Sequence, residues 1–151
     1  MKLIPGFLAA LALLAAQGCG GLASTDGELF PAPPENAITF WGHACCYLDI
    51  DGFGIATAPV FEKTTIFRRR RVDAPPPSSY QNTKLILISH AHPDHLSGNT
   101  LRTFPKDAVI LCPEPSVKYV DDLGFEFYAM LPGDRFEFPG GEIVAVKAWH
   151  M

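Results

Sequence analysis

Hydrophobic residues occur in short runs along most of the chain, and glycine, proline and polar residues separate these runs. Residues 37–41 are β-branched and aromatic, and two further apolar runs, 45–50 and 53–57, flank Asp51 and Gly52. An Asp-Gly pair between two apolar runs is a strong signal for a β-hairpin. The pattern therefore predicts a domain that opens with antiparallel strands.

The middle of the chain is typical of buried strands joined by loops and helices. Residues 84–88 contain Leu-Ile-Leu-Ile without a polar interruption, which predicts a strand buried on both faces. Residues 62–81 have the pattern of an insertion between strands. The elements expected after residue 88 are a short helix at 97–104, a strand at 108–111, a helix at 115–123 that ends before Gly124, and strands at 125–130, 135–138 and 142–148.

The first residues have a different pattern and are set apart from the fold. Lys2 precedes an apolar stretch at 3–16, and small residues follow before Cys19. This is the arrangement of an export signal, and the stretch is shorter than the roughly 20 residues that a membrane-spanning helix needs. Residues 16–19 also resemble a bacterial lipoprotein signal, in which the cysteine becomes the lipidated first residue. A plain secretory signal cut near Cys19 is the alternative.

Three segments follow from this pattern. Residues 1–18 are predicted to be a lipoprotein-type signal peptide, residues 19–36 a flexible tether rich in Gly, Ser and Pro, and residues 37–151 the folded domain. We therefore expect an exported protein, in the periplasm or on the cell surface, that is anchored to a membrane through Cys19.

The overall composition fits one globular domain. The 151 residues are 48% hydrophobic and 19% charged, and the net charge of −4 argues against nucleic acid as a partner. The one basic run consists of Arg68, Arg69, Arg70 and Arg71. Such a run is a solvated loop in one interpretation; in the other it recognises phosphate, carboxylate or anionic lipid headgroups.

The three cysteines of the predicted domain can be interpreted in two ways. Cys45, Cys46 and Cys112 lie in apolar runs and are interpreted as small hydrophobic residues. A disulfide from Cys112 to Cys45 or Cys46 is the alternative in an oxidising compartment.

The residues that carry chemistry come directly after the 84–88 strand. His90, His92, Asp94 and His95 lie within six residues, and imidazole and carboxylate are ligands for zinc and similar metals. His90 and His92 alternate and can point the same way, whereas Asp94 and His95 follow Pro93 and can turn toward a second position. The spacing suits two neighbouring ions, with Asp94 able to accept a proton from water. A solvated polar loop is the alternative.

The loop also carries a family resemblance. The segment SHAHPDHL at 89–96 resembles the His-x-His-x-Asp-His signature of the metallo-β-lactamase superfamily. The segments at 38–44, 123–134 and 146–150 are similar to those of its branch with N-acyl-phosphatidylethanolamine phospholipase D and L-ascorbate-6-phosphate lactonase-like proteins. The resemblance extends from residue 37 to residue 150.

This resemblance implies a fold and a site. The fold would be α/β, the N-terminal half of an αββα sandwich. It implies that His90, His92 and His150 hold a first zinc ion, and that Asp94 and His95 contribute to a second. Asp94 would also be catalytic. His43 is interpreted as a structural residue, or as a partner of the ligands, rather than as a ligand.

The chain departs from the family at two places. Ala58-Pro59 stands where the family has Asp-Pro, which would leave the metal loop with fewer bonding partners. The chain also ends at Met151, before the family's bridging Asp and final His. We interpret it as a truncated product of a longer reading frame. The alternative is a genuine short chain that pairs with itself through the exposed half-sheet or has lost activity.

Two functions are therefore compared. The first is a metal-dependent hydrolase that uses two zinc ions and acts on a small-molecule or lipid-like substrate. A phosphodiester is the substrate class that we favour, and a lactone or another ester is the alternative. The second is a non-catalytic, metal-binding lipoprotein remnant.

Overall fold

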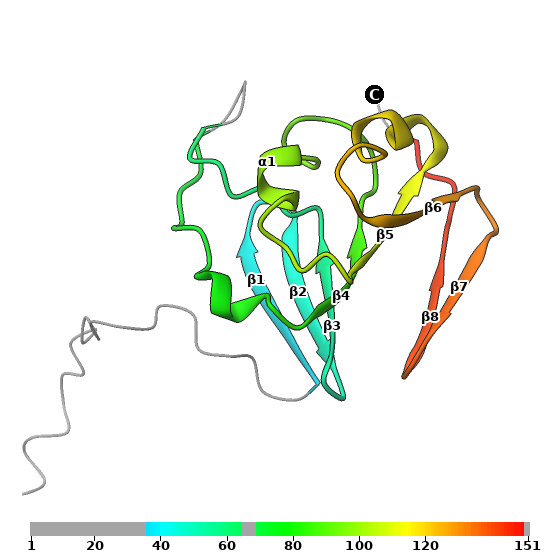
Figure 1. The fold of residues 1–151 in the computed structure, drawn as a ribbon, viewed down its shortest axis with the longest axis horizontal. Helices are drawn as coiled ribbons and strands as arrows, with labels where there is room; N and C mark the ends of the chain where they lie inside the picture. The colour runs from blue at the N-terminus through cyan, green and yellow to red at the C-terminus, as the bar shows by residue number, and fades with distance from the viewer. Residues whose placement is uncertain (1–35, 65–68, 150–151) are drawn as a thin grey trace, which may run out of the picture.

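The described part of the chain, residues 36–64 and 69–149 of a computed structural model, is built around a six-stranded sheet (Figure 1). Its strands lie side by side in sequence order: β1 (Ala37–Gly42), β2 (Cys45–Ile50), β3 (Phe53–Thr57), β4 (Thr83–Leu87), β5 (Val109–Pro113) and β6 (Glu126–Met130). A separate hairpin consists of β7 (Arg135–Phe138) and β8 (Gly141–Val144). The helical segments are short: η1 (Pro77–Ser79), α1 (Gly98–Leu101) and η2 (Glu114–Tyr119).

Several predicted features lie outside the described residues. These are the signal peptide, the lipidated Cys19, all of the tether except Asn36, Arg68, and the third histidine ligand, His150. In the described part, no helix has the length and apolar character needed to cross a membrane.

The opening hairpin is confirmed. Asp51 and Gly52 have φ angles of 50° and 81°, and they connect β2 to β3 with Ile50 opposite Phe53. Both residues of the tightest hairpin turn need positive φ, which Asp tolerates and Gly adopts freely. The Asp49 carboxylate accepts the N–H of Gly52 at 2.9 Å and fixes the turn further.

The sheet changes direction after this hairpin. Strands β1, β2 and β3 are antiparallel to one another, whereas β3, β4, β5 and β6 are parallel. Parallel neighbours need a crossover connection, and the connections here are the 58–82 loop, the segment that contains α1, and the segment that contains η2.

Each face of the sheet has its own hydrophobic cluster. The larger cluster is centred on Trp41, Tyr47, Ile86 and Ile110 and is closed by the segment with α1 and the 58–82 loop. On the other face, a smaller cluster around Ile55, Leu85 and Leu111 packs against hydrophobic residues of β7 and β8. The result is a mixed α/β layered structure with few helices, which confirms the predicted fold class. Phe127 of β6 packs against the larger cluster, and Phe136 and Phe138 of β7 pack against the smaller one.

Two helix predictions and one strand prediction need correction. The helix expected at 115–123 is a 3-10 segment, η2, followed by a turn in which the Val120 N–H donates to the Val117 carbonyl at 2.8 Å. The helical segment ends at Val120, whose φ angle of −125° lies outside the helical range. The helix expected at 97–104 is limited to α1. The strand expected to reach residue 148 ends at Val144, because Ala145 then bonds to the 133–134 turn.

All three described cysteines are free. Cys45 and Cys112 are each 1% exposed and belong to the larger cluster, which agrees with their interpretation as small hydrophobic residues. Burial raises the pKa of the Cys45 thiol to about 12. The alternative disulfide from Cys112 to Cys45 or Cys46 is therefore wrong for this structure.

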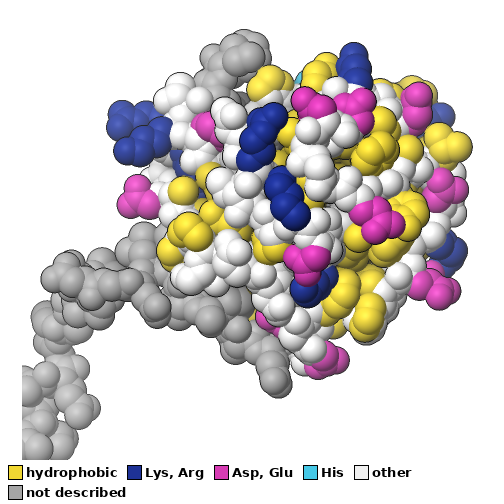
Figure 2. Space-filling model, viewed as in Figure 1, with side chains coloured by type: hydrophobic (Ala, Val, Ile, Leu, Met, Phe, Trp, Pro, Cys, Tyr) yellow, Lys and Arg dark blue, Asp and Glu magenta, His cyan; other side chains and the backbone are white. Residues whose placement is uncertain are grey.

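Some large hydrophobic side chains stay exposed. Ile38 and Phe40 on β1 are 75% and 64% exposed, and Val146 and Trp149 after β8 are 77% and 89% exposed. Figure 2 also shows hydrophobic side chains at the surface between the large sheet and the β7–β8 hairpin. Self-association through this half-sheet stays a prediction.

Gly54 gives a direct test of the packing at β3. A methyl group at this position would collide with the Tyr47 hydroxyl and lie 2.6 Å from the Asn82 carbonyl oxygen. Because backbone cannot move aside easily, we expect Gly54→Ala to lower the free energy of unfolding by about 1–3 kcal/mol in urea titrations. Gly98→Ala is the matched control, since its methyl group would meet the flexible end of Arg102 at 3.3 Å and the Leu123 side chain at an ordinary contact distance of 3.8 Å. Equal effects of the two variants would contradict this packing.

Candidate metal centre

The sheet brings one set of loops to a single edge. The carboxyl ends of β3, β4 and β5 are in register, with Thr57 opposite Leu87 and Leu87 opposite Leu111. The β1–β2 turn lies at the same edge, because Cys46 pairs with Thr57. In parallel sheets, ligands bind outside the carboxyl ends of the strands. The loop that carries His90–His95 leaves β4 here.

The loop after β4 folds back on itself. The His92 carbonyl accepts the N–H groups of His95 and Leu96 at 2.8 and 2.9 Å, so the loop closes directly after Pro93. The ring centroid of His90 lies 4.6 Å from that of His92 and 4.2 Å from that of His95. The Ser89 hydroxyl is 2.9 Å from His90 Nδ1. The predicted cluster of imidazoles is therefore gathered in space as well as in sequence.

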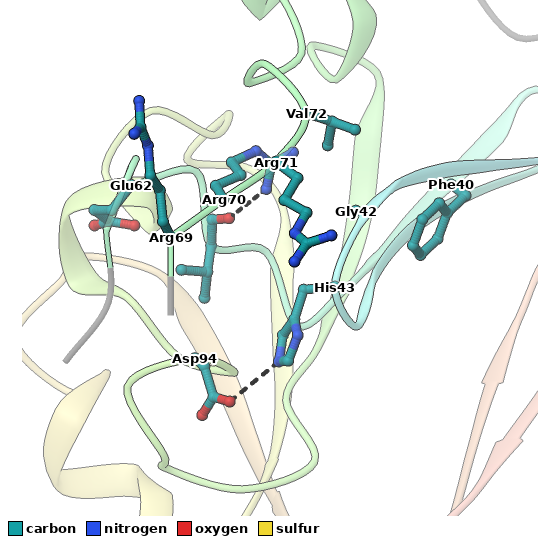
Figure 3. Close-up of a pocket in the computed structure, with 10 residues that line it drawn as sticks. Phe40, Gly42, His43, Glu62, Arg69, Arg70, Arg71, Val72 and Asp94 are labelled. Atoms are coloured by element: carbon teal, nitrogen blue, oxygen red, sulfur yellow. Dashed lines mark hydrogen bonds and ion pairs between the residues drawn. The ribbon is translucent and has the colours of Figure 1, made fainter. Parts of the chain in front are cut away.

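His43 approaches this loop from the β1–β2 turn. Its Nε2 atom is 3.1 Å from Asp94 Oδ2 (Figure 3). Its ring centroid is 5.1 Å from that of His95. His95 Nε2 is 3.9 Å from the same carboxylate oxygen. One ligand atom from each of His43, Asp94 and His95 lies within 4.8 Å of the others, which is a possible metal-binding group.

The surroundings keep Asp94 ionised. Its partial burial raises the pKa of the carboxyl group, but three influences lower it further than burial raises it: a backbone N–H, the neighbouring His95, and His43. The pKa of Asp94 therefore lies below its ordinary value. At neutral pH the residue offers a carboxylate, the form that binds a cation.

The donors at this edge fit the predicted metal chemistry. Imidazole nitrogens with a carboxylate suit zinc and other borderline divalent ions. Of the predicted ligands, His90, His92, Asp94 and His95 are brought together, whereas His150 lies outside the described residues.

A pocket opens beside His43 and Asp94. It has a volume of about 270 Å³, with an apolar wall from Phe40, Val60 and Val72. The polar residues that line it are His43, Glu62, Arg69, Arg70, Arg71 and Asp94. Figure 3 shows the Arg71 guanidinium pointing toward His43, whereas the Arg69 side chain extends the other way. The described arginines of the basic run thus border the candidate metal centre.

Arg70 differs from Arg69 and Arg71 because its side chain binds backbone carbonyl groups. Its guanidinium donates to the carbonyl oxygens of Val60, at 2.8 Å, and Trp41, and more weakly to that of Asp73 at 3.4 Å. These bonds tie the 58–82 loop to the end of β1. Of the predicted substrate candidates, Arg70 therefore binds backbone carbonyl groups, while Arg71 points toward His43 in the β1–β2 turn.

Sequence reasoning missed Glu62. Its carboxylate accepts from the Ser97 hydroxyl and, at 2.9 Å, from the Thr100 hydroxyl, and so fixes the 58–82 loop to α1. Thr100 also accepts the N–H of Phe61 at 2.8 Å. No local pattern could have identified this contact, because the partners are more than thirty residues apart.

Ala58 occupies the position where the family resemblance expects an aspartate. The residue is buried, its N–H donates to the Leu87 carbonyl at 2.9 Å, and its φ angle is 40°, directly before Pro59. The methyl side chain cannot accept a hydrogen bond from the metal loop.

The family can be identified from comparison with known proteins. Residues 37–151 match the family model described as the β-lactamase superfamily domain. A metal-dependent hydrolase of the UPF0173 group from Exiguobacterium is 27% identical over 113 residues, which cover 75% of this chain and 47% of the relative. A UPF0173 metal-dependent hydrolase from Methanopyrus kandleri is 28% identical over 123 residues and is covered to 46%. The chain thus spans about half the length of these curated relatives.

Solved structures lead to the same fold. A protein from Parabacteroides distasonis, described as a metal-dependent hydrolase, has a TM-score of 0.50 and 27% identity over 66% of this chain and 39% of its own. The diiron β-hydroxylase CmlA from Streptomyces venezuelae has a TM-score of 0.59 with 20% identity, over 78% of this chain and 24% of its own, which shows similarity of fold alone. With the His-x-His-x-Asp-His loop in place at the end of β4, this chain belongs to the metallo-β-lactamase superfamily.

Proposed function

We propose that the protein is a metal-dependent hydrolase that acts on an anionic ester, with a phosphodiester as the preferred class. The observation that carries this proposal is the pocket that Arg71 lines together with His43 and Asp94, with the Arg71 guanidinium pointing toward His43. A cation next to a metal centre favours a substrate with a negative charge close to the bond that breaks.

The proposed division of work follows from the positions of the side chains. His90 and His92 would bind the first of two divalent ions, taken to be zinc, together with His150. Asp94 and His95 would bind the second. A bound ion lowers the pKa of a water molecule and polarises a phosphoryl or carbonyl oxygen. The Asp94 carboxylate would accept the proton of the attacking water, and Arg71 would orient the anionic group.

The relatives support the reaction class, since several are described as metal-dependent hydrolases. The substrate class rests on the pocket alone. Its apolar wall and its volume of about 270 Å³ suit a small anionic group with an apolar neighbour, and an anionic lactone would satisfy the same features. We further propose export and anchoring through Cys19, on the sequence pattern of residues 1–19.

The activity can be tested with three chromogenic or coupled assays. The purified protein, supplied with zinc, would be assayed with bis(p-nitrophenyl) phosphate, a neutral p-nitrophenyl ester and an anionic lactone. We expect turnover of an anionic substrate that a chelator removes and zinc restores. Retention of zinc without turnover of any substrate would contradict the proposal and favour a non-catalytic, metal-binding protein.

Arg71 has a separate, substrate-dependent prediction. Arg71→Gln removes the charge that faces His43, so we expect kcat/KM for the anionic diester to fall by about 10-fold, mainly through KM. The neutral ester should be hydrolysed as before. Arg135→Gln, on the β7–β8 hairpin, is the matched control. Equal losses with both substrates would show that Arg71 supports the loop rather than recognising charge.

A further inference from the structure

The β1–β2 turn holds His43 in an unusual conformation. Gly42 and His43 have φ angles of 99° and 54°, so both lie in the left-handed region. A Cβ atom at Gly42 would lie 2.5 Å from the Val72 side chain, so the turn fits tightly against the 58–82 loop. Left-handed backbone at a residue other than glycine persists where its surroundings fix it, and such residues occur often at functional sites. The turn aims the imidazole at the loop after β4.

The distances around Asp94 match those within one coordination sphere. Ligand atoms bound tetrahedrally to zinc at about 2.0–2.1 Å stand roughly 3.3 Å from one another. The 3.1 Å from His43 Nε2 and the 3.9 Å from His95 Nε2 to Asp94 Oδ2 lie on either side of that value. A small closure around an ion would bring all three atoms, now within 4.8 Å of one another, into range.

We propose that His43 is a direct ligand of the second metal ion, together with Asp94 and His95. This inference rests on the proposed function only in that it requires the second ion. It replaces the earlier interpretation of His43 as a structural residue or a partner of the ligands. The β1–β2 turn and the loop after β4 would then be joined through the ion.

A ligand and a residue that only orients Asp94 make different predictions. His43→Asn is the informative variant, because asparagine tolerates the left-handed backbone and removes the Nε2 atom that would bind the ion. Its shorter amide is also a poor zinc ligand compared with imidazole. Asp51→Asn is the matched control, since Asp51 has a φ angle of 50° in the opposite hairpin turn.

The experiment measures metal binding rather than turnover. Purified protein and both variants would be titrated with Zn²⁺ against a chromophoric chelator, and the number of imidazoles per ion would be determined by X-ray absorption. We expect His43→Asn to lower the affinity for the second Zn²⁺ ion by more than about 100-fold. This exceeds the roughly 10–100-fold loss of affinity typical of a residue that only orients a ligand. The average imidazole count should fall, while Asp51→Asn should match the original protein.

Two results would overturn the inference in different ways. If His43→Asn keeps the second ion and an unchanged imidazole count, His43 is not a ligand, and the proposed function is unaffected. If the original protein binds no divalent ion, the proposed function fails together with this inference. Thermal unfolding of the metal-free proteins separates loss of a ligand from loss of the fold.

Discussion

Replacement of Asp94 by alanine is expected to lower phosphodiester hydrolysis by about 10²–10⁴-fold. The carboxylate is proposed both to bind the second ion and to accept a proton. Although burial raises the pKa of Asp94, a backbone N–H together with His95 and His43 keeps it below the ordinary value. Because the side chain is one-third exposed, its removal should leave the fold unchanged. Steady-state kinetics together with zinc analysis would measure both effects.

The control for this variant is another aspartate with a lowered pKa. Asp107 is paired with Lys84 at 2.7 Å, at the amino ends of β4 and β5 and so at the opposite edge of the sheet. Asp107→Ala should keep full activity. Similar rates of hydrolysis for Asp94→Ala and Asp107→Ala would show that Asp94 takes no part in the reaction.

Trp41→Ala is expected to lower the free energy of unfolding by about 3–5 kcal/mol. Trp41 is 1% exposed, and its ring stacks on Tyr47 at 4.9 Å between centroids, with Phe61 and Tyr80 at its edges at 5.9 and 6.0 Å. Loss of the indole would leave a cavity where the sheet meets the 58–82 loop. Urea titration followed by circular dichroism measures the change.

The chain contains a second tryptophan that serves as the matched control. Trp149 is 89% exposed, so Trp149→Ala should change the free energy of unfolding by no more than about 0.5 kcal/mol. If the two variants lost stability equally, the larger hydrophobic cluster would not be centred where the structure has it.

The sequence predicted elements that depend on local patterns. The runs at 53–57 and 84–88 correspond to β3 and β4, and the bounds of β4 differ from the prediction by one residue. They were predictable because the pattern of hydrophobic residues along a strand depends directly on which of its faces are buried. The Asp51-Gly52 turn was predictable for the same local reason. The helix at 115–123 was not, because the backbone leaves helical geometry at Val120, whose φ angle is −125°, although the apolar spacing continues to Leu123.

The site was predictable only where its residues are close in sequence. His90–His95 stood out as a cluster, and its position after a buried strand fixed its place at the sheet edge. The approach of His43 to Asp94 could not be predicted, because it depends on the order of strands and on the register of Cys46 with Thr57. The different roles of Arg70 and Arg71 likewise depend on which carbonyl groups lie nearby.

The central claim is that the loop at the end of β4 holds divalent metal ions. The most direct test is the zinc content of the purified protein after saturation with zinc and gel filtration, compared with the His90→Ala/His92→Ala double variant. We expect about two zinc ions per chain for the unmodified protein, and a clear loss of zinc for a folded double variant. Absence of zinc from the original protein, or an equal zinc content in the two, would contradict it.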